Sequence, residues 1–156
     1  MIIFDNPATV PAPAAQYSHL ARLDLGYKTI LQLSGQVAID ADGKIVGPDD
    51  MFVQADYIMD NITAILASQR ATLADVANIR SYVTDMGRLP EFGRVRAARF
   101  PGTPPTITTV EVTVVGSGRA HRSRDIRDYL IHRSRPALVS RRRKLRRRAS
   151  QRRGSR

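Results

Sequence analysis

The stretch DDMFVQADYIMDNITAIL, residues 49–66, has the pattern of an amphipathic helix. Its apolar residues recur at three- and four-residue spacings, which places them on one helical face. They are Ala55, Ile58, Met59, Ile62, Ile65 and Leu66. Four polar residues are expected on the other side: Gln54, Asp56, Asp60 and Thr63. Asp49 or Asp50 can cap the N-terminus by accepting from unpaired backbone N–H groups. The apolar face has to pack on another apolar surface.

The sequence before this helix predicts that surface. Residues 19–46 divide into short apolar segments at 20–25, 29–33, 37–39 and 44–46, separated by tight turns. Gly26 lies in the first turn, and Asp42-Gly43 is a pair that suits a hairpin. We therefore expect a β-meander whose apolar side is covered by the helix.

The sequence after the helix predicts two more strands and a second helix. Residues 79–84 form a short β-like segment, and residues 106–115 are dense in β-branched residues, which favour strands. Between them Pro90 suits the first turn of a helix, where its missing N–H costs nothing. Phe92, Val95 and Ala98 are expected to point inward and Arg94 outward. The order of elements predicts an α+β fold.

Composition excludes several classes of function. The chain has 156 residues, about the length of one domain, and no cysteine, so disulfides and thiolate chemistry are excluded. It has no apolar run of roughly 18 residues that would span a membrane, and its N-terminus lacks the features of a signal peptide. His19, His121 and His132 have no neighbouring pattern of a catalytic triad, and no metal-ligand cluster is present. We expect a cytoplasmic protein that uses no metal.

The net charge of +11 is unevenly distributed. Residues 1–115 carry nine Lys or Arg and twelve Asp or Glu, a net charge of −3, whereas residues 116–156 carry sixteen Lys or Arg against two Asp, a net charge of +14. A shift of this size indicates a boundary near Val115-Gly116. We expect a folded domain over residues 1–115 and a poorly ordered, Arg-rich tail over residues 116–156.

The folded part resembles the RidA/YjgF family. The resemblance rests on motifs in the family's order and spacing over about 100 residues: Tyr17, Ser34-Gly35-Gln36, Gln54, Asn61-Ile62, Asp75-Val76, Thr84-Asp85-Met86, Phe92 and Val110-Glu111-Val112. It implies a chorismate-mutase-like fold, two helices on a mixed β-sheet, assembled as a homotrimer with a small-molecule cleft at each subunit interface. It also implies hydrolytic deamination of reactive imines or enamines without a cofactor.

The resemblance assigns several residues to the cleft. Tyr17 matches the family's cleft tyrosine, with a surface ring as the alternative, and Ser34-Gly35 matches the backbone that contacts the ligand, with a strand end as the alternative. Thr109 belongs to the same set. Glu111 alternates with Val110 and Val112, so it faces away from them. Two interpretations fit it equally well: a solvated or ion-paired strand residue, and a site residue.

One departure from the family concerns substrate recognition. Imine-deaminating members carry an arginine three residues before Val-Glu-Val, where it grips the substrate carboxylate, and this chain has Ile107 there. An aliphatic side chain cannot bind a carboxylate, which needs a planar, bidentate donor. Arg96 on the second predicted helix is an alternative cation, or else an ordinary solvated arginine.

The second departure is the C-terminus. The family's last strand, Ala-Leu-Ile-Glu-Val-Glu-Ala-Ile-Ala, carries a glutamate proposed to position the hydrolytic water, and residues 118–126 do not match it. Residues 119–126 can, however, be encoded by codons whose shifted frame reads Ala-Leu-Ile-Glu-Val-Ala-Ile. The tail is thus either an out-of-frame translation or an evolved basic arm that neutralises nucleic-acid phosphates.

Three functions therefore remain open. The first is a cofactor-independent hydrolase of imines or enamines at an intersubunit cleft. The second is a trimer that binds a small ligand without catalysis, which Ile107 and the absent glutamate favour. The third is an RNA-binding, endoribonuclease-like or translation-inhibiting role, which would depend on the basic tail.

Overall fold

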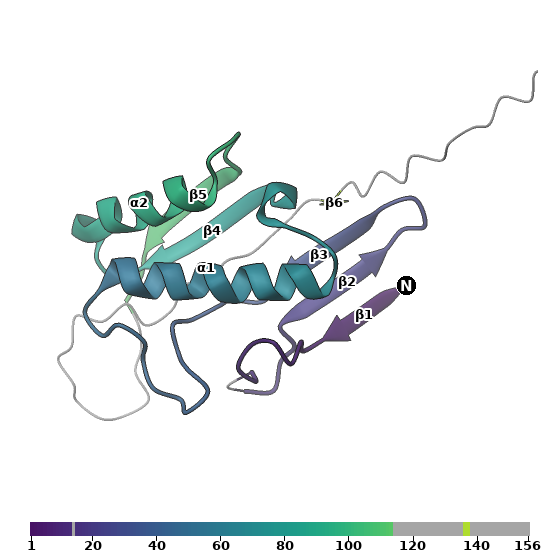
Figure 1. Ribbon diagram of the computed structural model, residues 1–156, viewed down its shortest axis with the longest axis horizontal. Helices are drawn as coiled ribbons and strands as arrows, with labels where there is room; N and C mark the ends of the chain where they lie inside the picture. The colour runs from purple at the N-terminus through teal and green to yellow at the C-terminus, as the bar shows by residue number, and fades with distance from the viewer. Residues whose placement is uncertain (14, 114–135, 138–156) are drawn as a thin grey trace, which may run out of the picture.

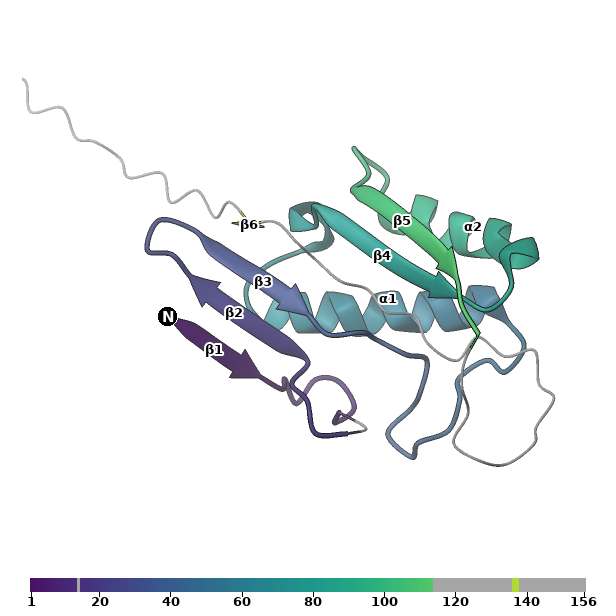
Figure 2. The same ribbon diagram turned by 180° about the vertical axis from the view of Figure 1, so that it is seen from behind.

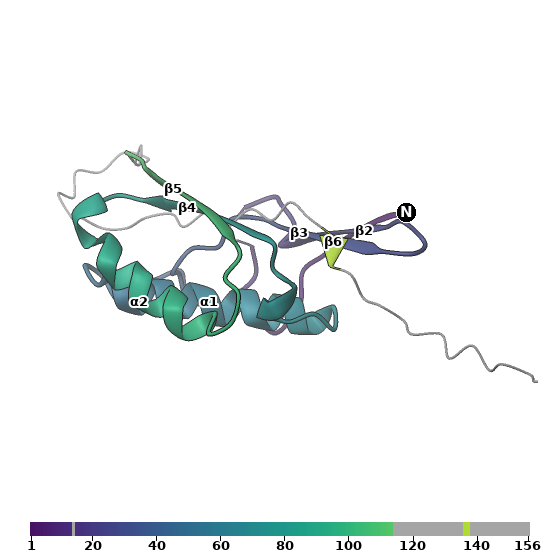
Figure 3. The same ribbon diagram turned by 90° about the horizontal axis from the view of Figure 1, so that it is seen from above.

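The computed structural model describes residues 1–13 and 15–113, and the backbone of residues 136–137. These residues form two layers, with helices α1 (Met51–Ser68) and α2 (Leu89–Arg99) side by side on one face of a layer of strands (Figures 1 and 3). Two short 3-10 turns, η1 (Leu73–Asp75) and η2 (Met86–Arg88), precede β4 and α2. The fold is α+β, with two helices on β-sheets, as the sequence predicts.

The strand layer consists of two separately paired sheets. β1 (Ile2–Asp5), β2 (Leu20–Asp24) and β3 (Thr29–Leu33) form an antiparallel meander, and β6 (Pro136–Ala137) pairs antiparallel with the start of β3. β4 (Asn78–Val83) and β5 (Thr106–Glu111) pair in parallel. In the reverse view β3, β4 and β5 run in the same direction, so their C-terminal ends lie at one end of the molecule (Figure 2).

The core lies between α1 and the strands. The α1 residues predicted to face inward are all buried, which confirms the helical pattern, and they pack with Leu20, Leu31, Leu33, Ile79 and Val83 from the strands. Asp50 is the N-cap, and its carboxylate accepts from the Val53 N–H at 2.9 Å. Pro90 lies in the first turn of α2, as predicted.

Four details differ from the prediction. Gln54 is fully buried instead of lying with the polar residues on the other side of the helix, and its Nε2 donates to the Gly47 carbonyl at 2.8 Å. Ala98 is exposed, since α2 turns only Phe92 and Val95 into the core. Residues 37–39 and 44–46 form no strands, only a single bridge between Ile39 and Ile45. Residues 2–5 are an unpredicted strand, because their partner, β2, is distant in sequence.

The face of the meander that points away from the helices is mostly apolar, with Gln32 as a polar residue beside Ala21. The β1–β2–β3 register places Phe4 beside Ala21, and Ile2 beside Leu23 and Ile30, on this face. Phe4 is 69% exposed and Ile2 is 59% exposed. An uncovered apolar sheet face of this kind is typical of a surface that another protein chain buries. Among the described residues, no helix is long and apolar enough to cross a membrane.

Candidate functional site

The segment before β2 is anchored by His19, which is 6% exposed. The His19 Nε2 lies 2.8 Å from the Pro11 carbonyl, which can only accept, so Nε2 carries the proton. The Nδ1 then accepts from the Gln36 Nε2 at 3.3 Å, and the backbone N–H donates to the Asn6 Oδ1 at 2.8 Å. Because both ring nitrogens are engaged, His19 has a structural role here and is not placed to act as a base.

Tyr17 packs its ring on this histidine. The two rings meet edge to face, with centroids 6.0 Å apart and an interplanar angle of 90°, and the Tyr17 side chain is 40% exposed. Its hydroxyl has no hydrogen-bond partner in the part of the chain that the structure describes. Tyr17 therefore presents an oriented ring with an available hydroxyl, as a ligand contact requires.

Ser34 and Gly35 follow directly after β3 and lie against the same segment. The Ser34 hydroxyl donates to the Ser18 carbonyl at 2.6 Å, and the Ser34 N–H donates to the His19 carbonyl at 2.9 Å. Gly35 is half-buried, and its N–H has no partner among residues 1–13 and 15–113. The structure thus brings Tyr17, Ser34 and Gly35 together, with a backbone donor beside them that no described residue engages. We refer to these three residues as the tyrosine half-site.

Ile107 and Thr109 form a second group on β5, which we call the β5 half-site. The parallel register sets them beside Ile79 and Ser81 of β4, on the side that faces the helices. Ile107 is half-buried and packs against the core. The Thr109 and Ser81 hydroxyls are 2.8 Å apart, and the Ser81 hydroxyl also lies 3.4 Å from the Thr108 carbonyl. The half-site offers one hydroxyl and no charge.

The third candidate, Arg96, lies on α2 and is half-buried. Two other arginines of that helix region are paired: Arg88 with Glu91 at 2.8 Å, and Arg99 with Asp56 and, at 2.7 Å, with Asp60. The hydrogen bond from Arg88 holds the pKa of Glu91 below its usual range. The Arg96 guanidinium has no ion pair among the described residues, so it is available to an anion.

Glu111 is explained by local structure. It is exposed at the end of β5, and its Oε2 accepts from the Met86 N–H at 3.1 Å, at the start of η2. No contact within the described chain joins the tyrosine half-site to the β5 half-site or to Arg96. The described residues also contain no group of three potential metal ligands.

The comparisons with known proteins agree with this fold. The family model for endoribonuclease L-PSP matches residues 8–120. The chain belongs to the endoribonuclease L-PSP family. This is the RidA/YjgF family that the sequence motifs resemble. Protein DfrA of Myxococcus xanthus is 30% identical over 108 residues, which is 69% of this chain and 81% of DfrA.

Two further L-PSP relatives bear on function and fold. The 3-aminoacrylate deaminase RutC of Acinetobacter baylyi is 27% identical over 109 residues, 70% of this chain and 83% of RutC. The crystal structure of the YjgF gene product from E. coli superposes with a TM-score of 0.65, at 22% identity, covering 86% of this chain and 97% of that one. The second comparison concerns the fold alone.

Sequence reasoning missed the structural roles of two residues at these candidate half-sites. Gln36 and Ser81 are buried polar residues that fix His19 and Thr109, and only their tertiary partners reveal this role. The alternation of apolar and polar residues over 79–84 predicts the face of the strand on which Ser81 lies. It does not predict that Ser81 forms a hydrogen bond with Thr109. Residues 118–126 and the basic tail lie outside the described residues, apart from the backbone of Pro136–Ala137.

Proposed function

We propose that this protein is a homotrimer with a small-molecule cleft at each subunit interface, and that it hydrolyses reactive imines or enamines without a cofactor. The observation that carries the proposal is the tyrosine half-site, where the exposed Tyr17 ring lies beside the Ser34–Gly35 segment and no described residue accepts from the Gly35 N–H. A 27% identical relative is a deaminase of 3-aminoacrylate, which is an enamine that also carries a carboxylate, so it supports the reacting group of the proposed substrate and not the absence of a carboxylate.

The trimer is supported by the uncovered sheet face. Ile2, Phe4, Leu23 and Ile30 lie on that face without a covering layer among the described residues. Burying such side chains contributes roughly 25 cal/mol for each Å² removed from water, so assembly through this face is favourable. In a trimer, the tyrosine half-site of one subunit and the β5 half-site of its neighbour would each supply one wall of the cleft.

The proposed chemistry is addition of water across a C=N bond. The water oxygen bonds to the imine carbon, the nitrogen takes up protons, and the C–N bond then breaks to give a carbonyl compound and ammonia. The Tyr17 hydroxyl, the Gly35 N–H and the Thr109 hydroxyl are suited to orient the polar atoms of the ligand. We assign no general base, because the glutamate that the family uses lies in the strand that this sequence lacks.

The substrate should lack a carboxylate. Ile107 offers neither charge nor donor at the position where related enzymes hold an arginine, and an unpaired carboxylate enclosed in the cleft would cost several kcal/mol. Small imines or enamines without this group are therefore the preferred ligands. Arg96 is the one candidate that would change this preference, because its guanidinium is unpaired among the described residues.

The test compares two substrates of similar size, one a 2-iminoacid generated in situ by a dehydratase and the other an imine without a carboxylate. We expect the protein to accelerate hydrolysis over the spontaneous rate only for the imine without a carboxylate. The Tyr17→Ala variant should lose most of this acceleration. Efficient clearance of the 2-iminoacid would contradict the carboxylate argument, and Arg96→Ala would then show whether Arg96 binds it. Binding of either ligand without turnover would indicate the non-catalytic alternative.

The RNA-directed alternative depends on the basic tail. Sixteen Lys or Arg in residues 116–156 would release counterions on binding phosphates, so binding should weaken steeply with salt. Truncation after Val115 should abolish RNA binding if the tail carries it. Binding that survives truncation would assign it to the folded part, and absence of binding by the whole chain would exclude this role.

A further inference from the structure

β1 is the outer strand of the meander. The sheet order begins with β1, so one side of this strand pairs with β2 and the other side has no partner among the described residues. Both front and reverse views show β1 at the border of the strand layer (Figures 1 and 2). An exposed strand edge is a template for another chain, and Lys, Pro or a bulge commonly blocks it. β1 reads Ile-Ile-Phe-Asp and pairs with β2 without a break, so it has none of these three devices.

The pairing pattern shows which backbone groups of β1 face outward. Met1 and Asp24 exchange two main-chain hydrogen bonds: the Asp24 N–H donates to the Met1 carbonyl at 2.9 Å, and the Met1 nitrogen donates to the Asp24 carbonyl at 3.1 Å. Hydrogen-bonded and non-hydrogen-bonded positions alternate along an antiparallel pair. The backbone groups of Ile3 are therefore directed to β2, whereas those of Ile2 and Phe4 point to the open side of β1.

The side chains of this edge are apolar on both faces of the sheet. Ile2 and Phe4 lie on the face that points away from the helices and Ile3 on the other, because side chains alternate along a strand. Ile3 is 40% exposed, and the other two are more exposed still. The one charged side chain of β1, Asp5, accepts from the Gln69 Nε2 at 2.9 Å. A strand that pairs here has to be apolar on both faces, as β1 itself is.

Two copies of β1 match each other about a two-fold axis at Ile3. In this antiparallel register Ile2 of one copy lies opposite Phe4 of the other, and the outward N–H and C=O groups of these residues form four main-chain hydrogen bonds. Every apolar side chain then meets an apolar partner, since Ile3 meets its own copy. An axis at Phe4 would instead set the Asp5 carboxylate opposite Ile3. The pattern therefore favours the axis at Ile3.

We propose that the open edge of β1 is an interaction surface for a second copy of this chain, with the two β1 strands paired antiparallel about Ile3. The two meanders then form one continuous sheet. Their apolar outer faces also become continuous, because Phe4 of one copy lies beside Ile2 of the other, which itself lies beside Leu23. A two-fold contact does not occur within a cyclic trimer, so in the proposed trimer this edge joins two trimers.

The contact is short, and this sets its strength. Two paired four-residue strands bury less area than a standard protein interface, so association should be weak and depend on protein concentration. In sedimentation velocity of the full chain, the smallest stable species, whether monomer or trimer, should double in mass as the concentration rises. Assembly through the sheet face alone would give three chains and no doubling, so the two contacts are distinguishable.

Single cysteines report the register directly, because the chain has no cysteine of its own. Ile3→Cys places two sulfurs at a non-hydrogen-bonded pair, where the Cα atoms are about 4.5 Å apart, within the range that a disulfide spans. Phe4→Cys is the matched control, since its two copies would be offset along the strands and more than about 7 Å apart. Under mild oxidation Ile3→Cys should form covalent dimers at least about tenfold faster than Phe4→Cys.

A second pair of variants tests the main-chain hydrogen bonds. In the Ile3→Cys chain, Phe4→Pro removes an outward N–H and leaves the bonds from β1 to β2, whereas Phe4→Ala keeps that N–H. Cross-linking should persist with Phe4→Ala and fall to the level of the Phe4→Cys control with Phe4→Pro. Circular dichroism shows whether Phe4→Pro remains folded, and the two cysteine variants decide the question if it does not.

Three results would overturn the proposal. The first is cross-linking of Phe4→Cys as fast as that of Ile3→Cys, which would exclude this register. The second is an equal effect of the folded Phe4→Pro and Phe4→Ala variants, which would assign the contact to side chains of the sheet face. The third is a chain that neither doubles in mass at any concentration nor cross-links through Ile3→Cys.

Discussion

The hydroxyl groups of Ser81 and Thr109 meet across the β4–β5 pair, 2.8 Å apart, with Ser81 fully buried. Thr109→Val keeps the side-chain shape and removes this bond, leaving the Ser81 hydroxyl only the Thr108 carbonyl at 3.4 Å. We expect a loss of about 1 kcal/mol in the free energy of unfolding, measured by urea denaturation. Thr108→Val, on the exposed side of β5, is the control and should change stability little. Equal losses in the two variants would show that the hydroxyl pair contributes nothing.

Ile107→Arg tests the absence of a carboxylate-binding residue. Ile107 is only half-buried, so an arginine can extend towards solvent, at a stability cost of about 1–2 kcal/mol for the lost packing. In a chain whose last strand is restored by correcting the frame, turnover of 2-iminoacids should rise by on the order of a hundredfold. In the present chain the same substitution should do little, because no glutamate positions water. Ile107→Lys introduces the same positive charge as Ile107→Arg but lacks the planar guanidinium, so its turnover of 2-iminoacids should rise less.

Gly47 is predicted to be more sensitive to substitution than Gly43. Both have a positive φ, 61° and 77°, which costs an alanine roughly 1–2 kcal/mol. A Cβ at Gly47 would also lie 2.5 Å from the Val53 Cγ1, whereas at Gly43 it would meet nothing within 4 Å. Gly47→Ala should therefore destabilise by at least about 1 kcal/mol more than Gly43→Ala, since overpacking adds to the strain. Thermal and urea unfolding of the two variants measure the difference, and equal losses would contradict it.

The Arg88–Glu91 pair should make stability depend on pH at the acid end. Because the hydrogen bond from Arg88 lowers the pKa of Glu91 in the folded state, the pair stabilises the protein above the unfolded pKa of about 4.3, and this contribution is lost as pH falls through the folded pKa. Glu91→Gln should cost about 0.5–1 kcal/mol at neutral pH and nothing in strong acid. Arg88→Gln and the double variant complete a double-mutant cycle that measures the coupling free energy between the two side chains. A coupling free energy that does not decrease in acid would contradict the mechanism.

Much of the fold was predictable because its patterns are local. Each of these patterns involves residues within one or two helical turns of each other. They are the apolar spacing of α1 from Ala55 to Leu66, the Asp50 cap and the position of Pro90 in α2. Errors arose where a distant partner decides the outcome. The buried Gln54 side chain donates a hydrogen bond to the Gly47 carbonyl in the preceding loop, and β1 is a strand because it pairs with β2. The hydrophobic periodicity of the sequence reveals neither interaction.

The candidate site was predictable only as a set of residues. The family motifs pointed to Tyr17, Ser34 and Gly35, and the structure brings them together through Ser18 and His19. They did not reveal that Ile107 and Thr109 lie in a separate group, because that depends on the β4–β5 register. In the proposed trimer the two groups meet only across a subunit interface, which is why the order of motifs along one chain does not show that they are separate.

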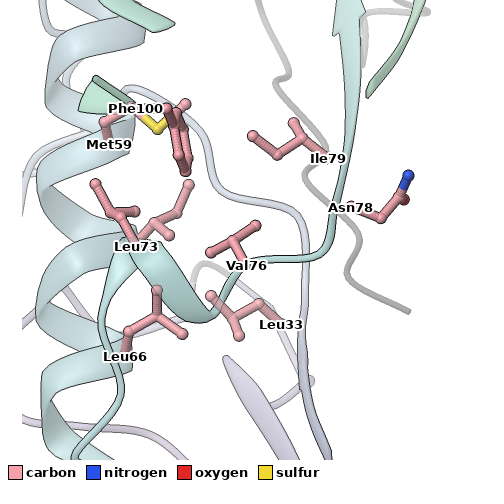
Figure 4. Close-up of a pocket in the computed structure, with 9 residues that line it drawn as sticks. Leu33, Met59, Leu66, Leu73, Val76, Asn78, Ile79 and Phe100 are labelled. Atoms are coloured by element: carbon pink, nitrogen blue, oxygen red, sulfur yellow. The ribbon is translucent and has the colours of Figure 1, made fainter. Parts of the chain in front are cut away.

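The separate pairing of the meander and of β4 with β5 also bears on how the chain folds. Among the described residues, no backbone hydrogen bond joins residues 1–46 to residues 77–113. The pairings within each part are themselves non-local, since β1 joins Ile2 to Leu23 and the parallel pair joins Asn78 to Thr106 across α2, and non-local pairing of this kind slows folding. The two parts nevertheless share one core, in which Leu33 of β3 and Ile79 of β4 line the same apolar pocket as Met59 of α1 (Figure 4). Hydrogen exchange should therefore show one common level of protection for α1, β3 and β4, because a shared core opens as a single cooperative unit.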